Sequence, residues 1–476
     1  MSTSQPLPTV ENREEDAKTS EGVWSASYRR LTLGLILILL GPAFEALAVA
    51  TILPKIVADL GGLSFYGWSF SAYLLATLVG LILAGDEADQ RGPALPFMIG
   101  VVSFVIGLIL AGTAPSMIVF VLSRSVQGFG AGILVSVTYA CVGQGYPEHL
   151  KPRMVAILAS AWALPGLIGP ALAGIISDFF SWRWVFLGLV FVLPLVTSLV
   201  LPALNKLTHS KKVREARTFD VRRSLATAGL VAGAAMTLTG LQVSSVPLAL
   251  VLFLSGLAIG IPSLRYVLPP GTLRVKAGLP AAIVTIGLLS IAFFGGVAFL
   301  PLTLISIRGQ NTIIAGIALT AATLSWTAGS WLQAHFAPKQ GRRLLVLIGL
   351  LIVAVGNVGN ASILIPGVPA LVAIVAWGVG GLGMGLAYST ISLVVLETAP
   401  KDQVGSASAS MELSAVLGEA LGTGLGGVII AFTVGTGRSQ SWGIAVIDIL
   451  VIAVTGLACL TAIRLPGRTS QNSSIA

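Results

Sequence analysis

The sequence predicts an all-α multi-pass membrane protein with fourteen transmembrane helices, built as two pseudo-symmetric six-helix bundles plus two inserted helices. Composition is the first reason: of the 476 residues, 55% are hydrophobic and 10% are charged, and the mean hydropathy is +0.93. Such a chain is too apolar for a soluble globular protein. The second reason is a series of apolar runs of about 20 residues, each long enough to cross a bilayer. The third is an internal repeat.

The apolar runs are expected to be helices, because a backbone in lipid must satisfy its hydrogen bonds within the segment. If both termini are cytoplasmic, most of the 28 Lys and Arg residues fall on the cytoplasmic side, as the positive-inside rule requires. The net charge of +9 then reflects topology and anionic membrane lipids, not nucleic acid. We expect a protein of the cell membrane, the inner membrane of a bacterium. The expected spans are 31–53, 66–84, 95–113, 117–143, 154–178, 184–204, 225–243, 246–268, 279–306, 312–334, 343–364, 369–396, 404–434 and 441–464.

Charge and hydropathy divide the chain into six parts. The longest charged loop, Asn205 to Ser224, is interpreted as a solvated cytoplasmic linker. The six parts are a cytoplasmic disordered tail (1–28), an N-terminal six-helix bundle (29–204), the basic cytoplasmic linker (205–224), two inserted helices (225–268), a C-terminal six-helix bundle (269–464) and a cytoplasmic tail (465–476).

The two sides of the linker repeat each other. The stretch QGFGAG at Gln127–Gly132 aligns with GGLGMG at Gly380–Gly385, at the same place in the fourth span of each half. Two halves in the same orientation form the kind of parallel repeat that transporters use for alternating access. The spans at 225–243 and 246–268 match nothing in either half, so we interpret them as an inserted pair.

Buried charge is the strongest functional signal. Within the expected spans stand Arg124, Glu45, Glu412, Glu419 and Asp448. A charge near the bilayer centre costs about 2.5–3.5 kcal/mol to insert, so such residues are functional candidates. Counting about 1.5 Å per residue from the outer ends of their helices places Glu45 and Arg124 at similar depths, which permits a pair or a water-bridged network.

We expect Glu45 and Arg124 to couple transport to protons, with Glu419 or Glu412 as a second site on one helix face. Other interpretations stay open. Glu45 and Arg124 could serve merely to orient helices. Glu412 and Glu419 could join closely packed helices or line a water-filled inner vestibule. Asp448, seven residues from the end of its span, could reach interfacial water.

Aromatic side chains suggest a central apolar pocket for a lipophilic substrate. The candidates are Phe44, Trp162, Phe294, Trp326 and Trp377. The alternative is that these residues face lipid or fill helix contacts.

Enzyme and pump chemistry have no support in the sequence. The three histidines lie in expected loops and exclude an HExxH metal site, and no GKS or GKT phosphate loop indicates an ATP-driven pump. We expect no enzyme activity, no metal and no cofactor, with a proton gradient as the energy source.

Four motifs carry a family resemblance. LSRSVQGFGAG (Leu122–Gly132) resembles a fourth-helix motif with a buried arginine, and FEALAVATILPKI (Phe44–Ile56) resembles a first-helix motif with an aspartate at the position of Glu45. GLIGPALAG (Gly166–Gly174) resembles a fifth-helix antiporter motif, and SWRWVF (Ser181–Phe186) resembles the segment entering the sixth helix. Together they resemble the major facilitator superfamily and, within it, the fourteen-spanner drug:proton antiporters, over about residues 30–465.

The resemblance implies a proton-coupled secondary transporter that exports lipophilic small molecules or drugs by alternating access. The alternatives are an exporter of a specific lipid or natural product, or a proton symporter of the same fold. Its partners would be a lipophilic substrate, protons and membrane lipids, and the protein would be a monomer. The antiporter motif residues would be Gly166, Gly169, Pro170 and Gly174.

One family motif is altered. In the loop after the second span, Gly85, Asp89 and Gly92 occupy the positions of a gating motif, whereas Glu87 and Gln90 replace the usual leucine and arginine. The resemblance implies a gate at this loop that is either weaker than usual or uses other partners.

Overall fold

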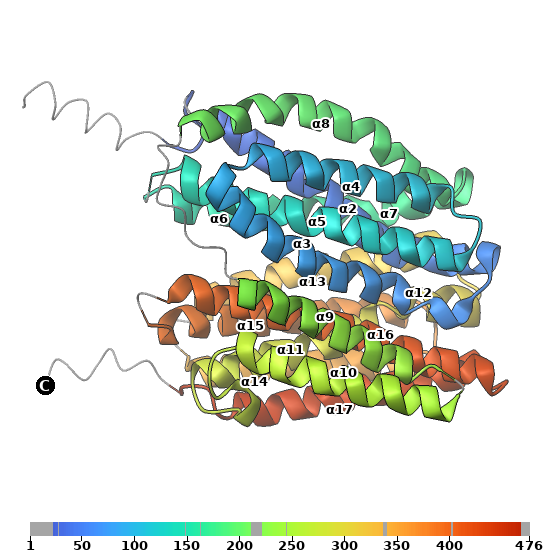
Figure 1. Ribbon diagram of the computed structural model, residues 1–476. Helices are drawn as coiled ribbons and strands as arrows, with labels where there is room; N and C mark the ends of the chain where they lie inside the picture. Colours follow the sequence, from blue (N-terminus) through green and yellow to red (C-terminus); the bar gives the residue numbers. More distant parts are fainter. Residues whose placement is uncertain are drawn as a thin grey trace, which may run out of the picture.

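The computed structural model describes residues 22–26, 28–147, 149–161, 163–210, 221–243, 245–336, 340–400 and 403–467. These residues are helical throughout, with short connections and no strand among them (Figure 1). The prediction of an all-α multi-pass membrane protein is therefore confirmed at the level of fold class.

The described residues of the first half form seven α-helices. Ser116 caps one of them, since its hydroxyl accepts a hydrogen bond from the backbone N–H of Val119 at 3.4 Å, which satisfies a free donor of the first turn. The helices are α2 (Arg29–Leu60), α3 (Trp68–Arg91), α4 (Ala94–Gly112), α5 (Met117–Gly145), α6 (Lys151–Ala161), α7 (Ala163–Phe179) and α8 (Arg183–Ser210), with the 3₁₀ turn η1 (Leu63–Phe65) after α2.

The remaining helices form the inserted pair and the second half. The pair is α9 (Val221–Gly240) and α10 (Val246–Val267), followed by the turn η2 (Thr272–Arg274). The second half is α11 (Leu279–Val297), α12 (Leu300–Leu302), the π-helical turn η3 (Thr303–Ile307), α13 (Thr312–Phe336), α14 (Arg342–Ser362), α15 (Val372–Thr398), α16 (Val404–Gly435) and α17 (Gln440–Ala462).

The number of crossings is confirmed only in part. Twelve helices of the described chain are long and apolar enough to cross a membrane. Two further apolar helices, at Leu164–Phe179 and Ser224–Gly240, are shorter and coincide with the expected spans 154–178 and 225–243. The expected span 154–178 is shared between α6 and α7, which lie on either side of residue 162. Fourteen crossings thus stay a prediction, as do the domain boundaries.

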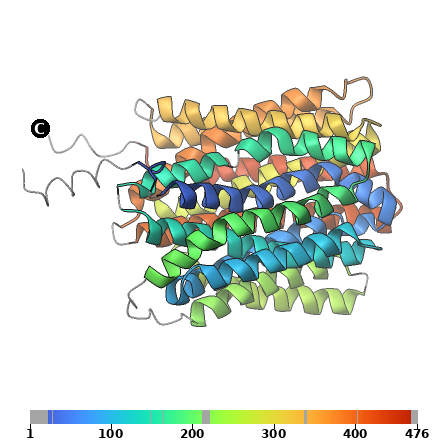
Figure 2. The ribbon, with the colours of Figure 1, turned by 90° about the horizontal axis from the view of Figure 1, so that it is seen from above.

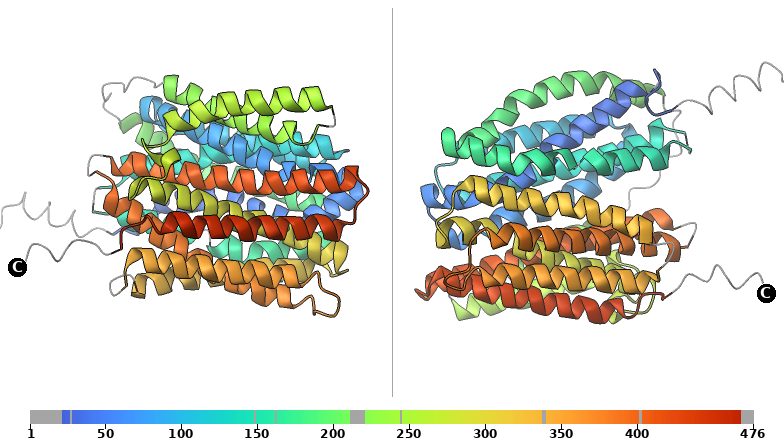
Figure 3. Two further views of the ribbon diagram at one scale, coloured as in Figure 1. Left: turned by 90° about the horizontal axis from the view of Figure 1, so that it is seen from below. Right: turned by 180° about the vertical axis from the view of Figure 1, so that it is seen from behind.

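The helices gather in two bundles with the inserted pair beside them (Figures 1 and 2). One buried apolar core is built mainly from α2 to α8 and another mainly from α11 to α17. The start of α2 and the end of α17 lie at the same end of the molecule (Figure 3). We call this the terminal end and the opposite one the distal end.

The bundles meet along two seams. In one, α7 packs on α13; in the other, α3 packs on α16. At the distal end of the second seam the two backbones approach very closely: a Cβ added at Gly67 would lie 2.5 Å from the Cα of Gly427. Nearby, the Tyr66 hydroxyl donates to the carbonyl of Ala298 at 3.0 Å. The halves are therefore held together at the distal end.

The inserted helix α9 lies against both halves. It packs on α3 and on α16, and the Trp68 Nε1–H of α3 donates to Gln242 Oε1, just after α9, at 3.0 Å. On the other side, a Cβ added at Gly424 of α16 would lie 2.5 Å from Leu238. α9 thus covers the α3/α16 seam, and α10 packs on α9.

Candidate transport site

The first half contains a buried ion pair. Arg124 of α5 and Glu45 of α2 are 1% and 0% exposed, and Arg124 Nη1 forms an ion pair with Glu45 Oε1. A buried charge is tolerated only when it is paired and hydrogen-bonded. The two residues are thus brought together as a direct pair, which is one of the two arrangements that their similar depths in the sequence permitted.

The guanidinium of Arg124 has further partners in the same bundle. Its Nη1 donates to Gln127 Oε1 at 2.7 Å, and its Nε donates to the backbone carbonyl of Ser69 at 3.0 Å. Its Cζ atom lies 4.2 Å from the centre of the Tyr73 ring, at cation–π distance. Arg124 therefore connects α2, α3 and α5 through one side chain.

Close backbone packing makes this network possible. A Cβ added at Gly128 would lie 2.0 Å from the carbonyl oxygen of Tyr73, so only glycine lets α5 approach α3 this closely. Gly128 is one turn after Arg124, and the approach carries the guanidinium to the Ser69 carbonyl. The glycine-rich stretch after Arg124 thus positions the charge.

The network contains two polar atoms without a partner. Among the described residues, neither Glu45 Oε2 nor Gln127 Nε2 has a hydrogen-bond partner, although both atoms are buried. An ionised carboxylate offers about four lone-pair sites, and Arg124 engages only one of its oxygens. The free oxygen of Glu45 can accept a proton without disturbing the contact that Oε1 makes.

Two carboxylates of the second half face the region between the bundles. Glu412 is exposed, and its Oε2 accepts a hydrogen bond from the Tyr388 hydroxyl at 3.1 Å. Glu419 is half-buried and acts electrostatically on Glu412 and on Tyr73, whose ring lies beneath Arg124. The charge of Glu419 therefore acts on Tyr73 of the Glu45–Arg124 network, whereas the hydrogen bond of Glu412 to Tyr388 stays within the second half.

The aromatic candidates separate into two groups. Phe294, Trp326 and Trp377 belong to one cluster around Phe293, whose ring centre lies 5.4, 5.7 and 5.3 Å from theirs. The cluster continues from Trp326 to Tyr388 at 5.7 Å. Phe44 is elsewhere, next to Gly169 of α7, and Trp162 lies outside the described residues.

Sequence reasoning missed Phe293 and Tyr388. Phe293 is adjacent to the named Phe294 and is 97% buried, so it packs inside the bundle where Phe294 is only half-buried. A search for every aromatic side chain within one turn of a candidate would have found Phe293. Tyr388 could have been found as a tyrosine in an apolar run, since its hydroxyl needs a partner there.

The alternative in which Asp448 reaches interfacial water is wrong. Asp448 is 3% exposed, and its Oδ1 accepts a hydrogen bond from Asn360 Nδ2 at 3.1 Å. Its closeness to the end of a span is offset by the direction of its side chain, which points into the second bundle. Asn360 and Asn357 were missed, although two amides three residues apart in an apolar run are themselves a signal.

The residues of the predicted antiporter motif lie mostly in the α7/α13 seam. A Cβ added at Gly166 would lie 2.1 Å from Thr323, and one added at Gly174 would lie 3.2 Å from the Thr312 carbonyl. Gly316 of α13 approaches the carbonyl of Pro170 in the same way. These residues let two helices of different halves touch, whereas Gly169 faces Phe44 of α2 within the first half, so the motif serves close packing on both sides of α7.

The residues of the predicted gating motif are described in part. Gly92 ends α3 with φ at +91°, a left-handed conformation that favours glycine and turns the chain toward α4. Gly85 and Asp89 fall within the range of α3, but their surroundings lie outside the described part of the chain.

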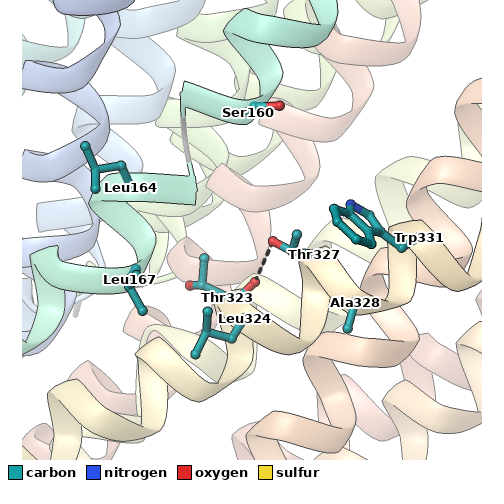
Figure 4. A pocket seen from close by; sticks show the side chains of 8 residues that line it. All are labelled: Ser160, Leu164, Leu167, Thr323, Leu324, Thr327, Ala328 and Trp331. Carbon is teal, nitrogen blue, oxygen red and sulfur yellow. Dashed lines mark hydrogen bonds between the residues drawn. The ribbon is translucent and has the colours of Figure 1, made fainter.

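A groove lies at the α7/α13 seam. Its volume is about 540 Å³, and most of its lining is apolar (Figure 4). Trp331 at its edge is 77% exposed, and Thr327 donates to the Thr323 carbonyl at 3.2 Å on its wall. The lining residues are Ser160, Leu164, Leu167, Thr323, Leu324, Thr327, Ala328 and Trp331, none of which was a candidate from sequence.

Comparison with known proteins identifies the family. The Major Facilitator Superfamily model matches residues 33–336. The multidrug transporter protein MdtP of Bacillus subtilis is 25% identical over 84% of this chain and 75% of its own length. The multidrug efflux pump SdrM of Staphylococcus aureus is 23% identical over 85% and 90%.

Solved structures agree on the fold. A POT family transporter in complex with 5-aminolevulinic acid superposes with a TM-score of 0.66, at 15% identity over 91% of this chain and 96% of that one. A D-xylose-proton symporter superposes with a TM-score of 0.60, also at 15% identity, over 90% and 97%. At this identity the likeness shows the architecture alone.

Proposed function

Since the chain belongs to the Major Facilitator Superfamily, a family of transporters and not of enzymes, we propose that it exports lipophilic small molecules or drugs in exchange for protons. The curated relatives named as multidrug transporters support this substrate class. We place the chain with the fourteen-spanner drug:proton antiporters, as a monomer in a bacterial cell membrane with both termini cytoplasmic. The proton gradient is the energy source, and no cofactor is required.

One observation carries the proposal: Glu45 is buried against Arg124 with one oxygen free. With Glu45 ionised, the pair is neutral as a whole and holds α2, α3 and α5 together. A proton on Oε2 cancels the negative charge and leaves Arg124 as a buried cation that needs another partner. The remaining partners of Arg124 are the Ser69 carbonyl, Gln127 and the Tyr73 ring. Protonation of Glu45 therefore shifts the contacts of Arg124 from α2 to α3 and α5 and loosens α2 from these two helices.

Such a shift suits alternating access. The halves touch at the distal end, and Glu412 is exposed toward the terminal end. With cytoplasmic termini, this conformation is closed to the outside and offers Glu412 and the aromatic cluster to the cytoplasm. A substrate bound at Phe294 and Trp326 would be released outside when the two halves separate at the distal end and close at the terminal end.

The groove at the α7/α13 seam favours a second candidate, an exporter of a lipid or natural product. Its lining is mostly apolar, and Leu164 and Trp331 are exposed at its rim. A molecule dissolved in the bilayer would meet this groove before any central site. A proton symporter of the same fold is the remaining alternative, and the direction of transport against the proton gradient distinguishes it.

The test is ethidium transport by everted membrane vesicles across an imposed pH gradient. We expect the wild type to accumulate ethidium when the vesicle interior is acidic, and Glu45→Gln to reach only the level of vesicles without the protein, at normal abundance. Glu397→Gln is the matched control, because Glu397 pairs with Arg342 at the surface, where an ion pair contributes little. Wild-type uptake by Glu45→Gln would refute Glu45 as the coupling residue.

A further inference from the structure

The second half contains a buried carboxyl group that has no cation beside it. Asp448 of α17 is 3% exposed; Asn360 Nδ2 donates to its Oδ1 at 3.1 Å. Its Oδ2 is buried and has no hydrogen-bond partner among the described residues. The same holds for the Nδ2 atom of Asn357, one turn before Asn360 and 1% exposed.

No charged group among the described residues balances Asp448. α17 packs against α11, α14, α16 and η3, and the only side chain from these elements that acts on its carboxyl group is Asn360, a neutral amide. The two glutamates of α16 act instead on each other and on Tyr388. Glu45, by contrast, has Arg124 as its counter-ion. Two carboxyl groups of similar burial therefore sit in opposite electrostatic settings.

A buried carboxylate without a counter-charge or a full set of donors is avoided in proteins, because the group takes up a proton instead. With its single hydrogen bond from an amide, Asp448 fits the neutral acid better than the anion. The unpartnered Oδ2 is the oxygen that would carry the proton.

The carboxyl group is also linked to the aromatic cluster. Asn360 uses its Oδ1 to accept a hydrogen bond from Trp377 Nε1 at 3.2 Å, and the Trp377 ring lies 5.3 Å from that of Phe293. Gly296 of α11 is pressed between these groups, since a Cβ there would lie 2.9 Å from Trp377 and 3.4 Å from Asn357 Oδ1. A displacement of the aromatic cluster therefore reaches Asp448 through one tryptophan and one asparagine.

We propose that Asp448 is a second proton-binding site, occupied in this conformation and emptied when substrate displaces the cluster of Phe293, Phe294, Trp326 and Trp377. On release the O–H bond at Oδ2 breaks, its electron pair stays on the oxygen and the proton passes to water. The proton occupancy follows from burial and hydrogen bonding alone. The release step rests on the proposed function, because it assumes a substrate at the aromatic cluster.

Infrared spectroscopy of the purified full-length protein tests the occupancy. A protonated carboxyl group has a C=O stretch that a carboxylate lacks and that shifts in D₂O. We expect Asp448→Asn to remove one such band near neutral pH and Glu397→Gln, which removes a paired surface carboxylate, to remove none. Should Asp448→Asn fail to fold, Asn360→Ala serves instead, since loss of the donor to Oδ1 shifts the same band. An unchanged spectrum in these variants would overturn the site.

Proton release on addition of ethidium, followed with a pH-indicator dye in detergent, tests the coupling. We expect Asp448→Asn to release roughly one proton fewer per transporter than the wild type. A purely structural Asp448 would lower thermal stability without changing that number. Loss of the infrared band with an unchanged proton count would overturn the release step and leave the bound proton. Absence of any release in the wild type would instead refute ethidium as a substrate, and the infrared result would stand.

Discussion

Glu45 and Arg124 form an ion pair closed off from solvent, although 79 residues separate them in the chain. The pair is one-sided: Arg124 has three further partners, whereas Glu45 has a free oxygen. Arg124 therefore stays bound to α3 and α5 even when the ion pair with Glu45 is lost. The carboxyl group is the part of the pair that can change state at small structural cost.

Replacement of Arg124 tests how much of its role is geometry. Lysine carries the charge but offers one ammonium group, so it cannot keep the contacts to Glu45, Gln127 and the Ser69 carbonyl together. We expect Arg124→Lys to reach the membrane and lose most gradient-driven ethidium transport. Arg124→Gln should also lower the amount of folded protein, because a buried carboxylate without a partner costs about 3–5 kcal/mol. Fluorescence-detected size-exclusion chromatography measures that amount.

The double variant Glu45→Gln/Arg124→Gln serves as the control for this prediction. It contains neither charge, so we expect it to recover folded protein relative to Arg124→Gln alone while staying inactive. An additive loss in the double variant would show that the two side chains do not stabilise each other.

Gly128 should be intolerant of any side chain. A methyl group there would overlap the Tyr73 carbonyl, and overpacking of this kind costs about 1–3 kcal/mol. We expect Gly128→Ala to lower the melting temperature and reduce ethidium transport. Gly188→Ala is the matched control, because a Cβ at Gly188 meets nothing within 4 Å. Equal stability of the two variants would mean that α3 and α5 are not in close contact.

Two tryptophans distinguish the central aromatic cluster from the lateral groove. Trp326 belongs to the cluster, whereas Trp331, five residues later on α13, is exposed at the groove. If drugs bind centrally, Trp326→Ala loses about 1 kcal/mol of aromatic stacking with the drug, which raises the half-maximal ethidium concentration several-fold. Trp331→Ala leaves that concentration unchanged. The reverse order would favour the lipid exporter. Concentration series in everted vesicles supply the measurement.

Topology can be tested by accessibility. Single cysteines at positions 115 and 438 should react with a membrane-impermeant reagent added to intact cells, and one at position 215 should react only after lysis. The native Cys141 and Cys459, the first buried and the second half-buried, are replaced beforehand. Labelling of position 215 from outside would overturn the fourteen-span arrangement.

The sequence predicted charged residues better than their surroundings. Glu45 and Arg124 stand out because any charge in an apolar run is costly, and counting residues along a helix gives their depth. The same counting failed for Asp448, since depth says nothing about whether a side chain points to the rim or into the bundle. Tyr73 and the Ser69 carbonyl carry no charge, so no pattern in the sequence separates them from ordinary residues. Their roles follow only from the packing of α3 on α5.

The inserted pair makes the two sides of the molecule different, although its two halves match. Each seam joins one helix of each half. α9 covers the seam between α3 and α16, and α10 packs on α9, while the seam between α7 and α13 keeps an open apolar groove. A compound diffusing in the bilayer thus meets a shielded flank on one side and a bare flank on the other. We therefore expect a compound dissolved in the bilayer to enter the protein from the side of the α7/α13 seam.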